Sequence, residues 1–225
     1  MSYKSIAIDG PSGAGKSTLA RKLAGELGFL YVDTGAIYRT VGLAAFRRGI
    51  DPSDGGQVTP MLPQLSIEMC YGGDGVQHML LNGGDVTEEI RRHEISRCAS
   101  QVSALPEVRA FLLERQRELA RAHDVIMDGR DIGTVVLPGA DVKIFLTASP
   151  EDRARRRYAE LSERGEQTCF EDVLRDVVQR DELDSSRTAA PLRQAEDAVL
   201  ADTSGLTLEE SFQLLLHIIE ERLQR

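Results

Sequence analysis

The sequence predicts an α/β protein with a P-loop type of parallel five-stranded sheet, covered by helices on both faces. Three observations predict it. Short apolar runs recur along the chain, longer amphipathic stretches separate them, and a glycine-rich turn follows the first run. Apolar runs that alternate with helices are typical of strands buried on both faces of a parallel sheet.

The predicted strands are the apolar runs at residues 5–8, 29–32, 125–127, 142–146 and 198–201. The predicted helices are the amphipathic stretches at 16–27, 35–48, 94–104, 107–122, 151–163, 170–186 and 207–223. "SERGEQT", at 162–168, reads as a loop tip between two of these helices. Segment 51–92 is rich in Gly and Pro, and its runs at 65–70 and 77–82 alternate like a hairpin with "GGDG" as the turn. We expect this segment to form a small inserted lobe.

Composition limits the possible functions. The 225 residues are 41% hydrophobic, which fits one domain with insertions, and the net charge of −9 argues against a nucleic-acid partner. The three cysteines, Cys70, Cys98 and Cys169, lack the spacing of a zinc site or a disulfide framework. No apolar stretch approaches the roughly 18 residues of a membrane helix, and no cleavable leader opens the chain. We therefore expect a cytoplasmic protein without membrane contact. We also expect a monomer, although the sequence does not reveal the oligomeric state.

The turn after the first strand has the full pattern G-x-x-x-x-G-K-[ST]. Its glycines allow successive N–H groups to converge on phosphate oxygens, and the following helix adds its positive end. Lys16 would reach the β- and γ-phosphates, and the Ser17 hydroxyl could bind Mg²⁺. The pattern predicts ATP binding by Gly10, Pro11, Ser12, Gly13, Ala14, Gly15, Lys16, Ser17 and Thr18.

The residues after the other strands indicate the type of reaction. No guanine-reading N-K-x-D tetrapeptide is present, and the third strand ends in Asp128-Gly-Arg-Asp131. Asp128 could hold Mg²⁺ directly or through water, and Arg130 could bind an anion. Asp33 or Thr34 would cap the helix after the second strand, with Arg39 in its second turn. A phosphotransferase needs several such cations because its two reactants repel each other.

Two further groups of charges fit this reaction. Arg153, Arg156 and Arg157 share one helix face and suit a lid over ATP phosphates, although a solvated face paired with acids is the alternative. Arg180, Asp184 and Arg187 also fall on one face. They could bind a phosphate and a sugar, or form an intrahelical ladder of salt bridges.

Several motifs together resemble the bacterial cytidylate (CMP) kinase family: "DGPSGAGKST", "DTGAIYR", "LNGGDVTEEIR", "ASQVSALPEVR", "MDGRDIGTVVLPGADVKIFLTAS" and "RDELDSSRTAAPL". They occur in the family's order over nearly the whole chain. The resemblance implies a nucleoside monophosphate kinase that converts ATP and CMP or dCMP into ADP and CDP or dCDP with Mg²⁺. It also implies a core (1–34, 93–150 and 188–225), an enlarged NMP-binding lobe (about 35–92) and a lid (about 151–187).

The resemblance further implies roles for individual residues. Ser100, Arg109 and Asp131 would read cytosine, and Arg39, Arg130 and Arg187 would hold the CMP phosphate. Arg180 and Asp184 would contact the sugar. Thr34 stands where the family usually has serine, and it keeps the hydroxyl. The implied catalytic groups are Lys16, Asp128, Arg130 and the lid arginines Arg153 and Arg157.

Two rival interpretations remain at this point. Another small-molecule P-loop kinase, acting on UMP, shikimate or a sugar acid, would share the phosphate-binding turn. A nucleotide-binding switch or assembly factor would bind ATP or GTP without acceptor-dependent turnover, but its guanine-reading motif is missing. An RNA-binding module is disfavoured by the negative net charge.

Overall fold

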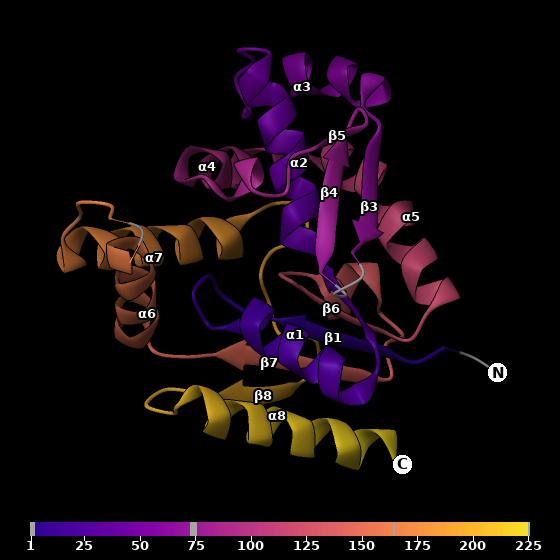
Figure 1. The fold of residues 1–225 in the computed structure, drawn as a ribbon, viewed down its shortest axis with the longest axis vertical. Coiled ribbons are helices and arrows are strands. Elements are labelled where there is room, and N and C mark those ends of the chain that lie inside the picture. Colours follow the sequence, from indigo (N-terminus) through magenta and orange to yellow (C-terminus); the bar gives the residue numbers. More distant parts are fainter. Residues whose placement is uncertain (1–2, 73–75, 164, 225) are drawn as a thin grey trace. The chain divides into compact units, whose positions relative to one another are not determined.

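The computed structural model describes residues 3–72, 76–163 and 165–224, and Figure 1 shows its elements. The chain forms two compact units. The first comprises Met1–Tyr31 together with Ala120–Arg225, and the second comprises Val32–Leu119. The second unit therefore includes 93–119, which the sequence analysis placed in the core. The division into core, NMP-binding lobe and lid stays a prediction.

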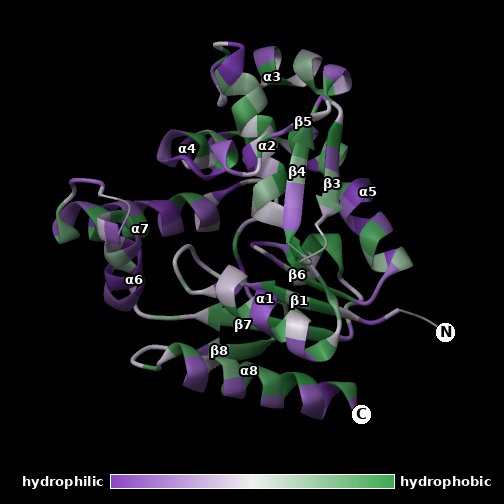
Figure 2. Cartoon of the chain, viewed as in Figure 1, coloured by the Kyte–Doolittle hydropathy of each residue, from purple (hydrophilic) through white to green (hydrophobic). Residues whose placement is uncertain are grey.

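The first unit is built on a five-stranded sheet in the order β2-β6-β1-β7-β8. Central β1 (Ser5–Asp9) pairs in parallel with β6 (Val125–Gly129) and β7 (Val142–Thr147), and β7 pairs in parallel with β8 (Val199–Asp202). The edge strand β2 (Leu30–Asp33) starts in this unit. The predicted five-stranded sheet is confirmed, and Figure 2 shows β1, β6 and β7 as largely hydrophobic.

Helices α1 (Lys16–Leu27) and α8 (Leu208–Leu223) pack with this sheet. Leu19 and Leu23 of α1, and Leu215 of α8, join Ile8 and Ile144 in one buried cluster. Each helix is amphipathic, and α8 begins with a capping box between Thr207 and Glu210. The apolar faces of both helices are thus buried in the core that supports β1.

A helical hairpin lies between β7 and β8 in the chain. It consists of α6 (Pro150–Glu163) and α7 (Phe170–Ser186), which share a small core of Ala154, Leu161, Val173 and Val177. The predicted loop tip at 162–168 joins them, and its residue 164 lies outside the described residues. This hairpin corresponds to the predicted lid segment.

The second unit begins with α2 (Thr34–Arg47), α3 (Gly55–Met61) and the 3₁₀ turn η1 (Leu62–Gln64). A three-stranded antiparallel sheet follows, with β3 (Ile67–Tyr71), β4 (Gln77–Leu81) and β5 (Gly84–Asp85). The turn η2 (Glu89–Arg91) leads to α4 (His93–Val102) and α5 (Pro106–Ala122), whose last residues belong to the first unit.

The predicted hairpin of this unit is confirmed, with Ile67 opposite Leu81 and Tyr71 opposite Gln77. Three residues of its predicted "GGDG" turn, 73–75, lie outside the described residues. Strand β5 and helix α3 were not predicted, because both lie in Gly-containing parts of the Gly- and Pro-rich segment 51–92. Helix α3 forms all the same, since Asp54 caps it through Gly56 N at 2.8 Å and its Val58 is buried.

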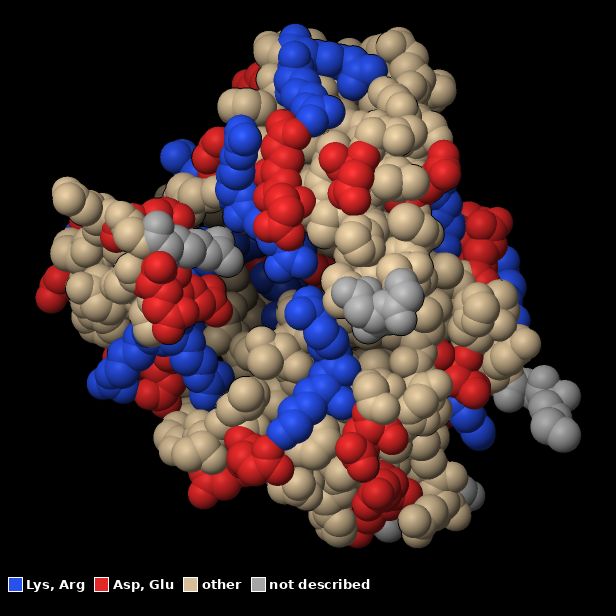
Figure 3. Space-filling model, in the orientation of Figure 1, with Lys and Arg blue, Asp and Glu red and all other residues tan. Residues whose placement is uncertain are grey.

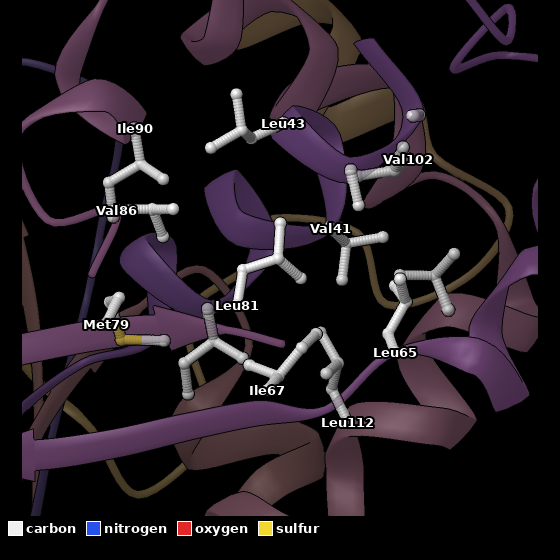
Figure 4. Packing of buried hydrophobic residues seen from close by; sticks show 14 of the residues in the cluster. Val41, Leu43, Leu65, Ile67, Met79, Leu81, Val86, Ile90, Val102 and Leu112 are labelled. Atoms are coloured by element: carbon white, nitrogen blue, oxygen red, sulfur yellow. The ribbon is translucent and has the colours of Figure 1, made fainter. Parts of the chain in front are cut away.

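A large apolar core holds the second unit together. Figure 4 shows side chains of α2, β3, β4, α4 and α5 pointing toward one another. Helices α2 and α4 approach closely at Gly42, where an added Cβ would lie only 2.9 Å from Ala99 N. This core fixes the helices that carry the predicted residues Thr34, Arg39, Ser100 and Arg109.

Within the described residues, no helix is both long and apolar enough to cross a membrane.

Candidate active site

The phosphate-binding turn runs from the end of β1 to the start of α1. Gly10, Gly13 and Gly15 adopt φ values of 151°, 75° and 87°, which favour glycine. A Cβ on Gly10 would also lie 1.9 Å from the carbonyl oxygen of Leu146. Glycine is therefore required for the turn to pass β7 closely before α1 begins, and the amides at the start of a helix suit a phosphate.

Lys16 carries a positive charge into this turn. Its side chain is buried, and Nζ donates to the carbonyl oxygen of Pro11 at 2.6 Å. Burial, and then the neighbouring Arg130 guanidinium, lower the pKa of Lys16 well below its usual range. A phosphate group beside Lys16 would offset both effects and favour the charged amine.

Asp128, at the end of β6, lies against the same turn. Its Oδ2 accepts from Ser17 Oγ at 2.8 Å, and its Oδ1 accepts from Tyr31 OH at 2.9 Å. A hydroxyl and a carboxylate are hard oxygen ligands, which suit Mg²⁺. The described residues contain no cluster of three His, Cys, Asp or Glu side chains that could hold a metal. Such a pair of oxygens is sufficient where substrate phosphates complete the coordination.

An arginine–aspartate–arginine cluster lies near Lys16. Asp184, in α7, accepts from Arg130 Nε at 2.8 Å and pairs with Arg187, the residue that directly follows α7. Burial opposes ionisation of Asp184, but Arg130 and Arg187 outweigh it and hold its pKa below the ordinary value of 3.8. Lys16 also interacts electrostatically with Arg130 and Asp184, so these groups form one charged site.

The arginines of α6 differ in their hydrogen-bond and ion-pair partners. Arg153 is buried, donates to the carbonyl oxygens of Ser12 and Ala148 at 3.0 and 2.9 Å, and pairs with Asp181 at 2.6 Å. Arg156 donates to Ala14 O and Thr203 O, each at 3.1 Å. Arg157 instead pairs with Glu160 of its own helix at 3.1 Å. Basic and acidic side chains are interspersed on this hairpin (Figure 3).

Asp131 follows Arg130 and precedes a short π-helix, η3 (Ile132–Val136). Its side chain is buried, and so is that of Asp9 at the end of β1. Asp9 accepts from Ile132 N at 2.8 Å through Oδ1 and from Gly133 N at 2.7 Å through Oδ2. Burial raises the pKa of Asp9 to about 6, although the two amides oppose this shift.

In the second unit, Asp33 organises the start of α2. It caps the helix through Ala36 N at 2.9 Å and binds Arg39 through its other oxygen at 2.7 Å. Its own N–H donates to Gln77 Oε1 at 2.8 Å. Thr34 is the buried first residue of the helix. Arg39 Nε is buried and has no hydrogen-bond partner among the described residues, so it can still donate to an anion.

Ser100 and Arg109 lie on either side of the turn from α4 to α5. The Ser100 carbonyl oxygen accepts from Ser103 Oγ at 2.9 Å, and the Ser103 carbonyl oxygen accepts from Arg109 Nη1 at 2.9 Å. The Arg109 guanidinium also lies over the Tyr38 ring, 5.5 Å from its centroid. These contacts hold the two predicted base-reading residues in one part of the second unit.

A family model described as cytidylate kinase matches residues 6–221. The chain belongs to the cytidylate kinase family. The cytidylate kinase of Carboxydothermus hydrogenoformans is 52% identical, over 95% of this chain and 96% of its own. That of Geobacter sp. (strain M21) is 49% identical, over 97% and 93%. A solved structure of an uncharacterized protein from Eubacterium ventriosum is 10% identical with a TM-score of 0.54, over 97% and 98%, and is similar in fold.

In this cytidylate kinase family member, the structure gathers the predicted Lys16, Ser17, Asp128, Arg130, Asp184 and Arg187 in the first unit. Arg180 also acts electrostatically on Asp184. Arg153 contacts the phosphate-binding turn, whereas Arg157 faces Glu160. Thr34 and Arg39 share α2, and Ser100 of α4 and Arg109 of α5 lie on either side of the turn between these helices. The roles of all these residues stay predictions.

Sequence reasoning missed five residues around these groups: Asp9, Tyr31, Gln77, Asp181 and, as a contact of the phosphate-binding turn, Arg156. One signal was available. Asp9 is a charged residue at the end of a buried strand, directly before the glycine turn, and a charge in that position requires buried partners.

Proposed function

We infer that this protein is a nucleoside monophosphate kinase that phosphorylates CMP. We propose ATP as the phosphoryl donor and dCMP as a second acceptor. One observation carries the chemistry: the buried Lys16 of a phosphate-binding turn shares its surroundings with the Arg130–Asp184–Arg187 cluster. Two phosphorylated reactants repel each other, so buried cations are the groups that such a transfer requires.

The donor nucleotide is assigned to the turn. Backbone amides from Gly10 to Thr18 and the start of α1 bind its phosphates, and Lys16 supplies the charge nearest the transferred group. Ser17 and Asp128 would hold Mg²⁺, directly or through water, and the bound ion would supply charge neutralisation at the phosphates. Tyr31 supports this role because it fixes the Asp128 carboxylate from the other side.

The acceptor is assigned to the arginines and polar groups that the resemblance implies for it. Arg39, Arg130 and Arg187 bind the CMP phosphate, Arg180 and Asp184 contact the sugar, and Thr34 contributes a hydroxyl at the acceptor site. The buried Arg39 Nε supports this assignment, because it lacks a hydrogen-bond partner among the described residues. The phosphate of CMP is an anion that such a donor can bind.

Cytosine is assigned to Ser100, Arg109 and Asp131. The exocyclic amine of cytosine donates, whereas its N3 and O2 accept, so a carboxylate or hydroxyl beside an arginine matches it. Uracil would leave the acceptor unpaired, which costs roughly 1–3 kcal/mol, or about ten- to hundred-fold in selectivity. The buried carboxylate of Asp131 fits this requirement.

The mechanism follows from these assignments. An ionised phosphate oxygen of CMP attacks the γ-phosphorus of ATP in line, so no strong base is needed. Lys16, Arg130 and the lid arginines Arg153 and Arg157 stabilise the charge that develops on the transferred group. Closure of the lid around the nucleotides excludes water and so suppresses hydrolysis of ATP.

An acceptor screen tests the proposed function. ADP release is measured at saturating ATP and Mg²⁺ with CMP, dCMP, UMP, AMP, shikimate or gluconate. We expect turnover with CMP and dCMP, and at least about ten-fold lower kcat/KM with UMP. A preference for another acceptor favours the rival small-molecule kinase, and ATP turnover that is the same with and without each acceptor contradicts the kinase proposal.

Two arginine variants test the proposed acceptor site. Arg187→Ala should remove CMP-dependent turnover, whereas the surface variant Arg175→Ala should retain it. Monomeric state, cytoplasmic location and the absence of nucleic-acid or membrane partners stay predictions.

A further inference from the structure

Asp9 connects the phosphate-binding turn with the segment that carries Arg130 and Asp131, both within the first unit. It is the last residue of β1, directly before Gly10 of the phosphate-binding turn. In the parallel register it lies opposite Gly129, the residue before Arg130. Its carboxylate then reaches the backbone just beyond Asp131. One side chain therefore holds the segment that carries both Arg130 and Asp131.

The contact is specific for a carboxylate. Each carboxylate oxygen accepts a hydrogen bond from one backbone amide, Ile132 N at 2.8 Å and Gly133 N at 2.7 Å. The Asp9 residue is only 5% exposed. Consecutive amides at the start of a helical turn have no partner inside that turn, so they need acceptors from elsewhere. An asparagine has a single carbonyl oxygen, and its NH₂ group would face the second amide.

The space around this contact is also limited. A Cβ added to Gly133 would lie 3.3 Å from Asp9 Oδ2 and 3.1 Å from Cδ of Lys143. Lys143 cannot move freely, because its Nζ donates to the carbonyl oxygen of Pro138 at 2.6 Å and to Asp197 at 2.9 Å. The amide of Gly133 is thus held between a fixed lysine stem and the carboxylate.

We propose that Asp9 is a positioning residue for the acceptor nucleotide. By binding the amides of Ile132 and Gly133, it fixes the backbone on which Arg130 and Asp131 present their side chains. The inference rests on the proposed function, in which Arg130 binds the CMP phosphate and Asp131 reads cytosine. Asp9 itself touches neither nucleotide. Its loss should weaken recognition of CMP far more than binding of ATP.

The kinetic test uses Asp9→Asn. KM for CMP should rise at least about ten-fold, and the preference for CMP over UMP should fall by a similar factor. KM for ATP should change by less than about three-fold, because Asp9 fixes the segment that binds the acceptor and does not touch ATP. The matched control is Asp141→Asn, since Asp141 holds the opposite end of β1 through Ser5 N at 2.8 Å. This control should keep both KM values and the selectivity of the wild type.

A second variant reaches the same contact from the other side. Gly133→Ala keeps the Asp9 charge but pushes the amide away from it, so it should also raise KM for CMP and reduce selectivity, by a smaller factor. Equal changes in KM for CMP and ATP in either variant would overturn the inference, because they would indicate general loosening. Unchanged kinetics in both variants would also overturn it.

Amide hydrogen exchange tests the contact independently of activity and of variant folding. In the wild-type protein without ligand, the amides of Ile132 and Gly133 should exchange far more slowly than the amide of Gly139 in the following loop. Exchange at the rate of Gly139 would overturn the inference. Wild-type protein without CMP-dependent turnover would refute the proposed function instead. Slow exchange at Ile132 and Gly133 would then still support the anchoring of this backbone by Asp9.

Discussion

At the level of single residues, two buried carboxylates of the first unit have pKa values that are shifted in opposite directions. Asp184 faces two guanidinium groups, which lower its pKa despite its burial. Asp9 faces neutral amides, and their hydrogen bonds do not compensate for the lost hydration, so its pKa rises to about 6. Loss of water favours the neutral form in both cases, and the guanidinium groups beside Asp184 reverse that preference.

The raised pKa of Asp9 predicts how stability depends on pH. The folded state binds the Asp9 proton more tightly than the unfolded state, where the pKa is near the ordinary 3.8. The stabilisation from this group is therefore complete below about pH 4 and is lost as the pH rises through about 6. A rise in the pKa of Asp9 from 3.8 to about 6 corresponds to roughly 3 kcal/mol of unfolding free energy.

Urea denaturation at pH 4, 5, 6 and 7 checks this prediction by comparing the wild type with Asp9→Asn. Asparagine does not titrate, so the unfolding free energy of the wild type minus that of the variant should fall as the pH rises. A difference that stays constant between pH 4 and 7 would show that Asp9 does not titrate in this range. Asp141→Asn serves as the comparison for a carboxylate that is less buried.

At the level of elements, the α6–α7 hairpin depends on Arg153. The side chain of Arg153 is 3% exposed and joins three elements: α7 through Asp181, the phosphate-binding turn through Ser12 O, and the end of β7 through Ala148 O. Arg157 is 29% exposed, and within the described residues its ion pair is with Glu160 of its own helix. The two predicted lid arginines therefore differ in what their loss would leave unsatisfied.

This difference predicts separate outcomes for two alanine variants. Arg153→Ala leaves Asp181 and two carbonyl oxygens without their donor, and should lower the unfolding free energy by about 2 kcal/mol or more. Arg157→Ala should lower it by less than about 1 kcal/mol, like an ordinary surface pair. Chemical denaturation measures both, with Arg175→Ala as the control because Arg175 pairs with Asp172 on the surface of α7. Equal losses for Arg153 and Arg157 would contradict this account.

The elements also show what sequence patterns could and could not predict. The five strands and seven helices follow from local periodicity, and their bounds agree with the structure to within one or two residues. Helix α3 was missed because its Gly and Pro residues read as loop, whereas an Asp54 cap and a buried Val58 outweigh that preference.

Local sequence patterns also limited what could be predicted of the site. The phosphate-binding turn and the arginines occur in local motifs, so spacing and resemblance suggested them. The contacts of Asp9 and Tyr31 are not local: Asp9 binds an amide 123 residues away, and Tyr31 binds Asp128 across 97 residues. Such partners follow only from strand order and register, which the sequence alone did not determine.

At the level of the whole molecule, each of the two units contains a large apolar core of its own. One cluster lies within Val32–Leu119 and includes Ile90, Ile95 and Leu112. Another lies within the first unit and includes Ile8, Ile144 and Leu215. Because each cluster is formed by residues of its own unit, local opening of one unit need not expose the apolar surface of the other.

Truncation in each core tests this independence. Ile90→Ala and Leu215→Ala remove fully buried side chains and should each cost about 2–4 kcal/mol. Native-state amide exchange should then show the loss of protection mainly in 32–119 for Ile90→Ala, and mainly in 1–31 and 120–225 for Leu215→Ala. The two variants are matched in chemistry and in burial, so a difference between their exchange maps reports where each core stabilises the chain. If both variants lowered protection equally throughout the chain, the units would open only together, and the two cores would act as one cooperative structure.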